Sequence, residues 1–259
     1  MPEARIRAIT FPIALEGGIT AVAYEEQIQE AIQTANEIFG RHRIARRPPI
    51  RFTLSSIWHN TDINSQSLLT RNIFEYAQRE GVSFHSAYRL MRSSVNPINR
   101  QRYGWSGPWN YGGFTVEILQ EMEDPDGVSY LPVSSEALSI LSLDQVPGEI
   151  ATYWVPGLSG GEHGITYYTP KFRDISSNNE GIFISYRTQA DILAHELGHL
   201  LMRAGHCSFE GDDGDQENSA PPTNLMHKYN AARQQNGPGR SLTGGQIDRM
   251  LSKGQAYLR

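Results

Sequence analysis

The stretch TQADILAHELGHLLMRAG, residues 188–205, is the most informative part of this sequence. Its apolar residues recur at helical spacing, Thr188 can cap the beginning and Gly205 can end it, so it predicts one helix. His195 and His199 are four residues apart, which puts both imidazoles on one face of that helix. The other face is apolar and consists of Leu193, Leu197, Leu200 and Ala204. We therefore expect a helix with one buried side and one metal-binding side.

The five residues from His195 to His199 match the pattern H-E-x-x-H. Neutral imidazole suits Zn²⁺, and an open position on that ion can hold a water whose pKa falls to about 7. Glu196 directly follows the first histidine and would point toward that water. It can accept a proton during attack on a carbonyl and pass it to the leaving amine. The pattern predicts a zinc-dependent peptidase with Glu196 as the general base.

A catalytic zinc needs a third protein ligand, and the sequence offers three sources. His206 would lie about 10 Å along the axis if the helix continued past His199, so the chain must turn back, which Gly205 permits. Cys207 could supply a thiolate, or it could be a buried spectator thiol. The third source is an acidic loop, which contains Glu210, Asp212, Asp213, Asp215 and Glu217. Calcium could bind that loop, but the spacing departs from the EF-hand pattern.

Other regular elements are expected on both sides of this helix. Strands are predicted near residues 6–15, 50–57, 148–157 and 180–187, with a shorter strand within 157–170. Helices are predicted over 24–39, 68–92 and 241–258, with a short helix or turn within 136–148. Ser241 or Thr243 would cap the last helix.

The composition excludes several classes of protein. The chain has 259 residues, 39% of them hydrophobic, and no apolar run near the roughly 18 residues that span a membrane. A formal net charge of −5 does not support nucleic-acid binding. One cysteine cannot form an internal disulfide. The first apolar stretch is short and contains Pro12, so we expect no signal peptide. Secretion through a removed leader or a non-classical route stays open. The sequence determines neither the localisation nor the oligomeric state.

The residues HELGHLLMRAGH, followed by NLMH, resemble the metzincin clan of zinc peptidases. That clan pairs H-E-x-x-H-x-x-G-x-x-H with a methionine turn beneath the metal. The resemblance implies that His195, His199 and His206 bind one catalytic zinc and that Met226 is the turn methionine. Here Met202 stands in place of the motif's glycine, and the third histidine comes one residue late. Tyr229, three residues after Met226, could stabilise an oxyanion or have a structural role.

The resemblance also implies an α+β, metzincin-like fold. A twisted mixed sheet and two long helices would form an upper subdomain, residues 1–204, with an insertion at 58–147. A small lower subdomain, residues 205–259, would contain the methionine turn and the final helix, and the active-site cleft would lie between the two. An extended peptide would lie antiparallel on an edge strand formed by Gly164, Ile165, Thr166 and Tyr167.

Two alternatives stay open. A thermolysin-like zinc peptidase would take an acidic third ligand such as Glu217, although Pro221 and Pro222 argue against a helix there. A zinc-stabilised binding module or toxin component would bind the metal without proteolysis, but it would be expected to lack the base, and Glu196 is present. The expected partner is a protein or peptide substrate.

Overall fold

The computed structural model describes thirteen parts of the chain. They are residues 1–15, 18–21, 23–40, 47–59, 79, 81, 115–127, 129–141, 145–159, 162–185, 190–206, 223–227 and 241–259. Within these parts, no helix has the length and apolar character needed to cross a bilayer.

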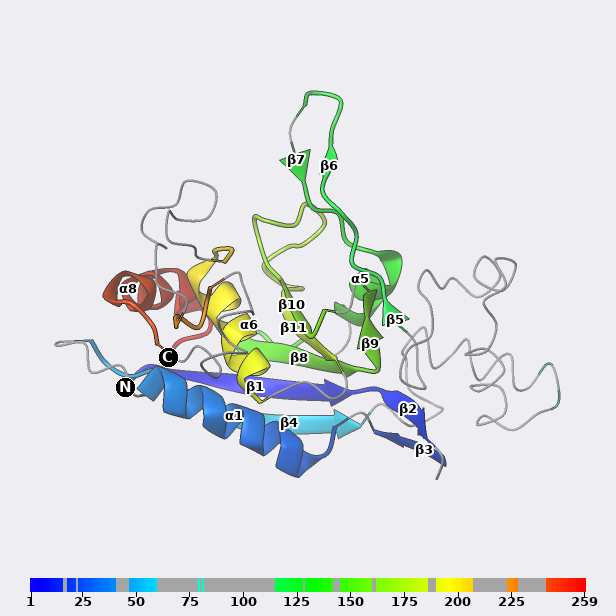
Figure 1. The fold of residues 1–259 in the computed structure, drawn as a ribbon, viewed down its shortest axis with the longest axis horizontal. Coiled ribbons are helices and arrows are strands. Elements are labelled where there is room, and N and C mark those ends of the chain that lie inside the picture. Colours follow the sequence, from blue (N-terminus) through cyan, green and yellow to red (C-terminus); the bar gives the residue numbers. More distant parts are fainter. Residues whose placement is uncertain are drawn as a thin grey trace.

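A five-stranded mixed sheet forms the centre of the fold (Figure 1). Its strands are β10 (Gly164–Tyr167), β11 (Gly181–Ser185), β8 (Glu149–Val155), β1 (Glu3–Thr10) and β4 (Arg51–His59), in that spatial order. The pairs β11–β8, β8–β1 and β1–β4 are parallel, and β10 runs antiparallel to β11. The predicted mixed sheet is therefore confirmed, and β10 lies at its edge.

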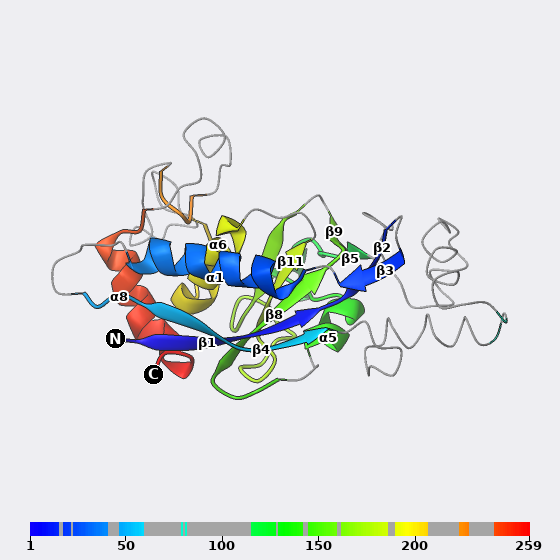
Figure 2. The same cartoon turned by 90° about the horizontal axis from the view of Figure 1, so that it is seen from below.

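The sheet is covered on both faces. Helices α1 (Glu25–Gly40) and α6 (Asp191–Met202) pack against each other and against one face, as Figure 2 shows from below. Strand β8 is buried along its whole length, because its side chains alternate between two cores. Ile150 and Trp154 face the core with α1 and α6, whereas Tyr153 belongs to a second core with helix α5 (Ser135–Leu141).

Helix α8 (Gly244–Lys253) packs on α6 from the C-terminal part of the chain. Thr243 and Gln246 form a capping box at its beginning, so Thr243 is the cap of the two predicted. A single turn of 3₁₀ helix, η3 (Gly254–Ala256), follows it and brings Tyr257 into the core.

In the described parts of the chain, six short strands form pairs outside the central sheet. They are β2 (Pro12–Leu15) with β3 (Gly18–Ala21), β5 (Thr115–Val116) with β9 (Gly157–Leu158), and β6 (Met122–Glu123) with β7 (Ser129–Tyr130). The predicted strand 6–15 is thus divided. The N–H of Phe11 still bonds to the carbonyl of Trp154 on β8, and β2 then begins at Pro12, which has no N–H to continue that ladder. The β6–β7 hairpin projects from the body of the protein (Figure 1).

Helix α6 is shorter than the predicted 188–205. It begins at Asp191, and Thr188 lies outside the described residues. It ends at Met202, and the left-handed residue that turns the chain is Arg203, with φ 54°, so the prediction that Gly205 makes this turn is wrong. The predicted apolar face is confirmed, since its four side chains are all at most 5% exposed.

Several sequence predictions concern residues that the structure does not describe. These are the helix 68–92 apart from residues 79 and 81, Cys207, the acidic loop with Glu217, and Tyr229. The division into subdomains 1–204 and 205–259 stays a prediction.

Candidate metal centre

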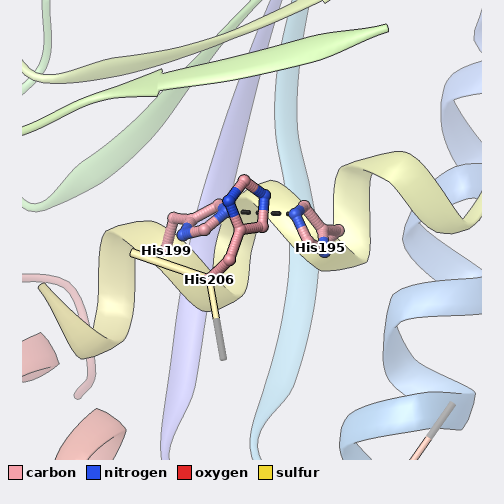
Figure 3. A group of neighbouring side chains, drawn as sticks. All are labelled: His195, His199 and His206. Atoms are coloured by element: carbon pink, nitrogen blue, oxygen red, sulfur yellow. Dashed lines mark hydrogen bonds between the residues drawn. The ribbon is translucent and has the colours of Figure 1, made fainter. Parts of the chain in front are cut away.

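Three histidines converge beside helix α6 (Figure 3). His195 and His199 lie one turn apart on the helix, and His206 returns to them from the segment that follows it. One nitrogen from each ring lies within 4.8 Å of the others. The ring centroids are 4.6 to 5.1 Å apart. The structure thus brings together the three predicted ligands as a group that can hold a metal ion.

Main-chain carbonyls orient two of the rings. His195 Nδ1 lies 2.6 Å from the carbonyl oxygen of Leu225, and His199 Nδ1 lies 2.8 Å from that of Ala204. A carbonyl oxygen only accepts, so both Nδ1 atoms must be the donors. In a neutral imidazole this leaves Nε2 with a lone pair, which is the form that binds a metal.

The pKa of His199 is lowered well below its usual value. Burial is the main cause, and the charges of His195 and His206 act in the same direction. His199 therefore stays neutral at neutral pH, and its Nε2 keeps the lone pair that metal binding requires.

The two Nε2 atoms of His195 and His199 lie 3.0 Å apart. Both carry lone pairs in the tautomers described above, so they repel each other unless a positive charge is shared between them. Two nitrogens bound to one tetrahedral zinc at about 2.0–2.1 Å would lie about 3.3–3.4 Å apart. The observed spacing is close to that value, and the donor set fits zinc.

Glu196 lies beside this group and is 5% exposed. Thr166 on β10 donates its hydroxyl to Glu196 Oε2 at 2.6 Å and contacts the main-chain oxygen of Glu196 at 3.0 Å. A Cβ placed on Gly164 would come within 2.9 Å of Glu196 Oε1. The strand therefore packs directly on the carboxylate and fixes its position, which requires a residue without a side chain at 164.

Met226 lies under the helix in the turn 223–227 and is fully buried. A Cβ on Gly198 would meet its sulfur at 2.3 Å. Asn224 Oδ1 accepts the N–H of Met226 at 2.9 Å, and the amides of Asn224 and Gln246 bond to each other in both directions, at 2.9 and 3.1 Å. Helix α8 thus fixes the turn whose Leu225 carbonyl orients His195.

A cleft of about 490 Å³ opens in front of the three histidines and Glu196. Gly164, Ile165 and Thr166 line it, whereas Tyr167 is 1% exposed and belongs to the core. Apolar residues 118, 119 and 131, from the segment 58–147, also line it. His227 contributes as well, although it is not one of the three converging histidines.

Sequence reasoning missed the residues that position this group. The hydroxyl contact of Thr166 with Glu196 had no local signal, because the two residues are 30 positions apart. The sequence carried weak signals for Asn224 and Gln246. An asparagine side chain commonly bonds to the main chain two residues further on, and a glutamine three residues after Thr243 completes a capping box.

Among the solved structures that the chain resembles is one of low similarity. This is metalloproteinase-II from Bacteroides fragilis, with 12% sequence identity and a TM-score of 0.38. The match covers 96% of this chain and 52% of the other, so the chain spans about half the length of that protein. No protein-family model and no curated protein sequence matches the chain. The function of this chain is therefore inferred from the residues of the site.

Proposed function

We propose that the protein is a zinc-dependent endopeptidase with a metzincin-like active site. The observation that carries this proposal is the geometry of His195, His199 and His206. Their nitrogens converge within 4.8 Å, and two of the rings are held by carbonyls in the tautomer that binds a metal. A buried carboxylate, Glu196, and a sheet edge lie beside them in the same cleft.

Zinc is the metal that these donors favour. Among the described residues only three imidazoles form this group, and three protein ligands with one open coordination position are typical of a catalytic zinc site. When bound, the ion polarises a substrate carbonyl and lowers the pKa of a water to about 7. His195, His199 and His206 would hold it.

Glu196 would move the proton. The hydrogen bond from the Thr166 hydroxyl to Oε2 holds the carboxylate in the cleft, where it would accept a proton from the attacking water. Glu196 would then deliver that proton to the leaving amine. Burial beside β10 fixes the carboxylate, so little reorientation is needed before the proton is transferred.

Strand β10 supplies main-chain groups for an extended peptide. The N–H of Ser185 donates to the carbonyl of His163, which makes this pair hydrogen-bonded across β10 and β11. Pairs alternate along an antiparallel ladder, so the main-chain groups of Gly164 and Thr166 face away from β11, toward the open edge. A substrate strand could bind there without strong dependence on its sequence.

The length of α6 supports the metzincin-like interpretation. The helix runs to Met202, and the left-handed residue is Arg203, three residues before His206. The same three-residue spacing separates the glycine from the third histidine in the motif of the clan. One added residue would account both for Met202 at the usual glycine position and for the late histidine. Met226 would be the methionine of the turn.

The test is cleavage of an unfolded protein by wild type and by Glu196→Gln, with zinc measured in both. We expect equal zinc content and a loss of cleavage in the variant. Glu162→Gln is the matched control, since it removes an exposed carboxylate from the rim of the same cleft and should keep activity. Bound zinc with equally negligible cleavage in all three proteins would favour the binding-module alternative and refute the peptidase.

A thermolysin-like site would use an acidic third ligand instead of His206. Its candidate, Glu217, lies outside the described residues. Under the proposed assignment, His206→Ala loses zinc and Glu217→Gln keeps it. The opposite pattern would support the acidic ligand.

A further inference from the structure

A buried ionic cluster lies behind the turn that follows α6. Glu180 is at its centre, with a side chain only 1% exposed. It accepts hydrogen bonds from the guanidinium of Arg203, from the hydroxyl of Tyr257 at 2.7 Å and from the N–H of Thr169 at 2.9 Å. We call Arg203, Glu180 and Tyr257 the Arg203 clamp.

The clamp acts on a residue in an unusual conformation. Arg203 has φ 54° and ψ 43°, a left-handed geometry that residues other than glycine rarely adopt. Its guanidinium also donates to the carbonyl of Thr169 at 3.4 Å and lies 6.0 Å from the centre of the Tyr257 ring. These contacts hold the side chain from several directions and so stabilise the backbone that carries it.

The turn at Arg203 determines where two of the metal-binding candidates lie. The carbonyl of Ala204, the next residue, accepts from His199 Nδ1 and orients that ring. His206 reaches the other two histidines only because the helix stops at Met202 and the chain reverses. A change of backbone at Arg203 would move both.

We infer that Glu180 and Tyr257 are positioning residues for the metal centre, although neither belongs to the three-histidine group. They act through Arg203, whose left-handed turn they hold in place. The inference rests on the proposed metal site but not on peptide cleavage. Burial and the charge of Glu180 raise the pKa of Tyr257, so its phenol stays protonated and remains a donor.

The structure offers a matched control for the smallest change to the clamp. Tyr257→Phe removes one buried hydroxyl that bonds to Glu180. Tyr153→Phe also removes a buried hydroxyl, which donates to the carbonyl of Leu141, but from the core on the other face of the sheet. Both changes should reduce stability, and only the first should change metal binding.

The experiment measures zinc affinity by competition with a chelator, together with the visible spectrum of the Co²⁺-substituted protein. We expect zinc binding to weaken about 10-fold for Tyr257→Phe and about 10- to 100-fold for Glu180→Gln and Arg203→Ala, with an altered Co²⁺ spectrum. Arg203→Lys keeps a cation for Glu180 and should recover part of the affinity. Tyr153→Phe should bind zinc like wild type.

Unchanged zinc affinity and an unchanged spectrum in folded Tyr257→Phe and Arg203→Ala would overturn the inference, even if Glu180→Gln fails to fold. Equal weakening in Tyr153→Phe would also overturn it, because the effect would then be general loss of stability. If wild type binds no zinc, both the proposed function and this inference fail. If zinc binds and the clamp variants weaken it but no peptide is cleaved, only the peptidase proposal fails.

Discussion

The contact between Gly198 and Met226 gives the sharpest stability prediction. A Cβ at 198 would lie 2.3 Å from Met226 Sδ and 3.1 Å from its Cε, whereas atoms in contact usually lie about 3.5–4.0 Å apart. Met226 is fully buried, so its sulfur has no solvent to move into. Gly198→Ala should therefore overpack the space between α6 and the turn 223–227.

The magnitude follows from two opposing effects. Overpacking of a buried site costs about 1–3 kcal/mol, and alanine favours a helix interior over glycine by about 1 kcal/mol. Gly198→Ala should therefore lower the free energy of unfolding by about 0–2 kcal/mol. In a Met226→Ala background the new methyl fills vacated space, and the same change should raise stability by about 1 kcal/mol. The expected coupling is about 1–3 kcal/mol.

The assay is urea unfolding of metal-free wild type, both single variants and the double variant. Gly40→Ala is the control for helix propensity, because a Cβ on Gly40 meets nothing within 4 Å. If Gly198→Ala has the same effect in both backgrounds, within about 0.5 kcal/mol, the close contact with Met226 does not exist as described.

Three further predictions concern the residues around the metal group. Thr166→Val removes the hydroxyl bond to Glu196, worth about 1.5–3 kcal/mol, so kcat/KM should fall about 10- to 100-fold at unchanged zinc content; equal activity would contradict the role of Thr166. Asn224→Ala leaves the N–H of Met226 without its acceptor and frees the turn that orients His195. The free energy of unfolding, measured by thermal unfolding, should therefore fall by about 1–3 kcal/mol. The zinc affinity, measured by competition with a chelator, should be about 10-fold weaker. Removal of metal should abolish cleavage and lower Tm by several degrees, since zinc at about 100 times its Kd contributes about 2.7 kcal/mol to the stability of the folded protein. Added Zn²⁺ should restore both, and an unchanged Tm would mean that no metal was bound.

The parts of the site that sequence predicted are those controlled by local geometry. His195 and His199 lie on one face because a helix puts residues i and i+4 there, and the buried face opposite follows from the same period. The helical period needs no knowledge of the rest of the fold. The edge position of β10, in contrast, is implied only by the resemblance to the clan, and the sheet order agrees with it.

The turn after α6 could not be predicted in this way. Glycine was the natural choice for a reversal, and the structure uses Arg203, whose conformation depends on Glu180, 23 residues away, and through it on Tyr257. Local propensity favours neither this residue nor this position. Tertiary contacts determine the conformation of this turn. The position of His206 beside the other two histidines therefore depends on contacts between distant residues, which a single sequence does not reveal.

The same limit applies to the supports of the other site residues. Thr166 meets Glu196 only because β10 packs along α6, and Asn224 meets Gln246 only because α8 folds back on the helix. Each partner is an ordinary polar residue in its own segment. Their roles become visible only when the sheet and helices are assembled.

X-ray absorption of the zinc-loaded protein identifies the atoms that bind the metal. A three-histidine centre should give three imidazole nitrogens at about 2.0–2.1 Å in wild type, whereas His206→Ala, which loses zinc, should give no such shell. A sulfur at about 2.3 Å, as from Cys207, or the same imidazole shell in wild type and His206→Ala would contradict a three-histidine centre.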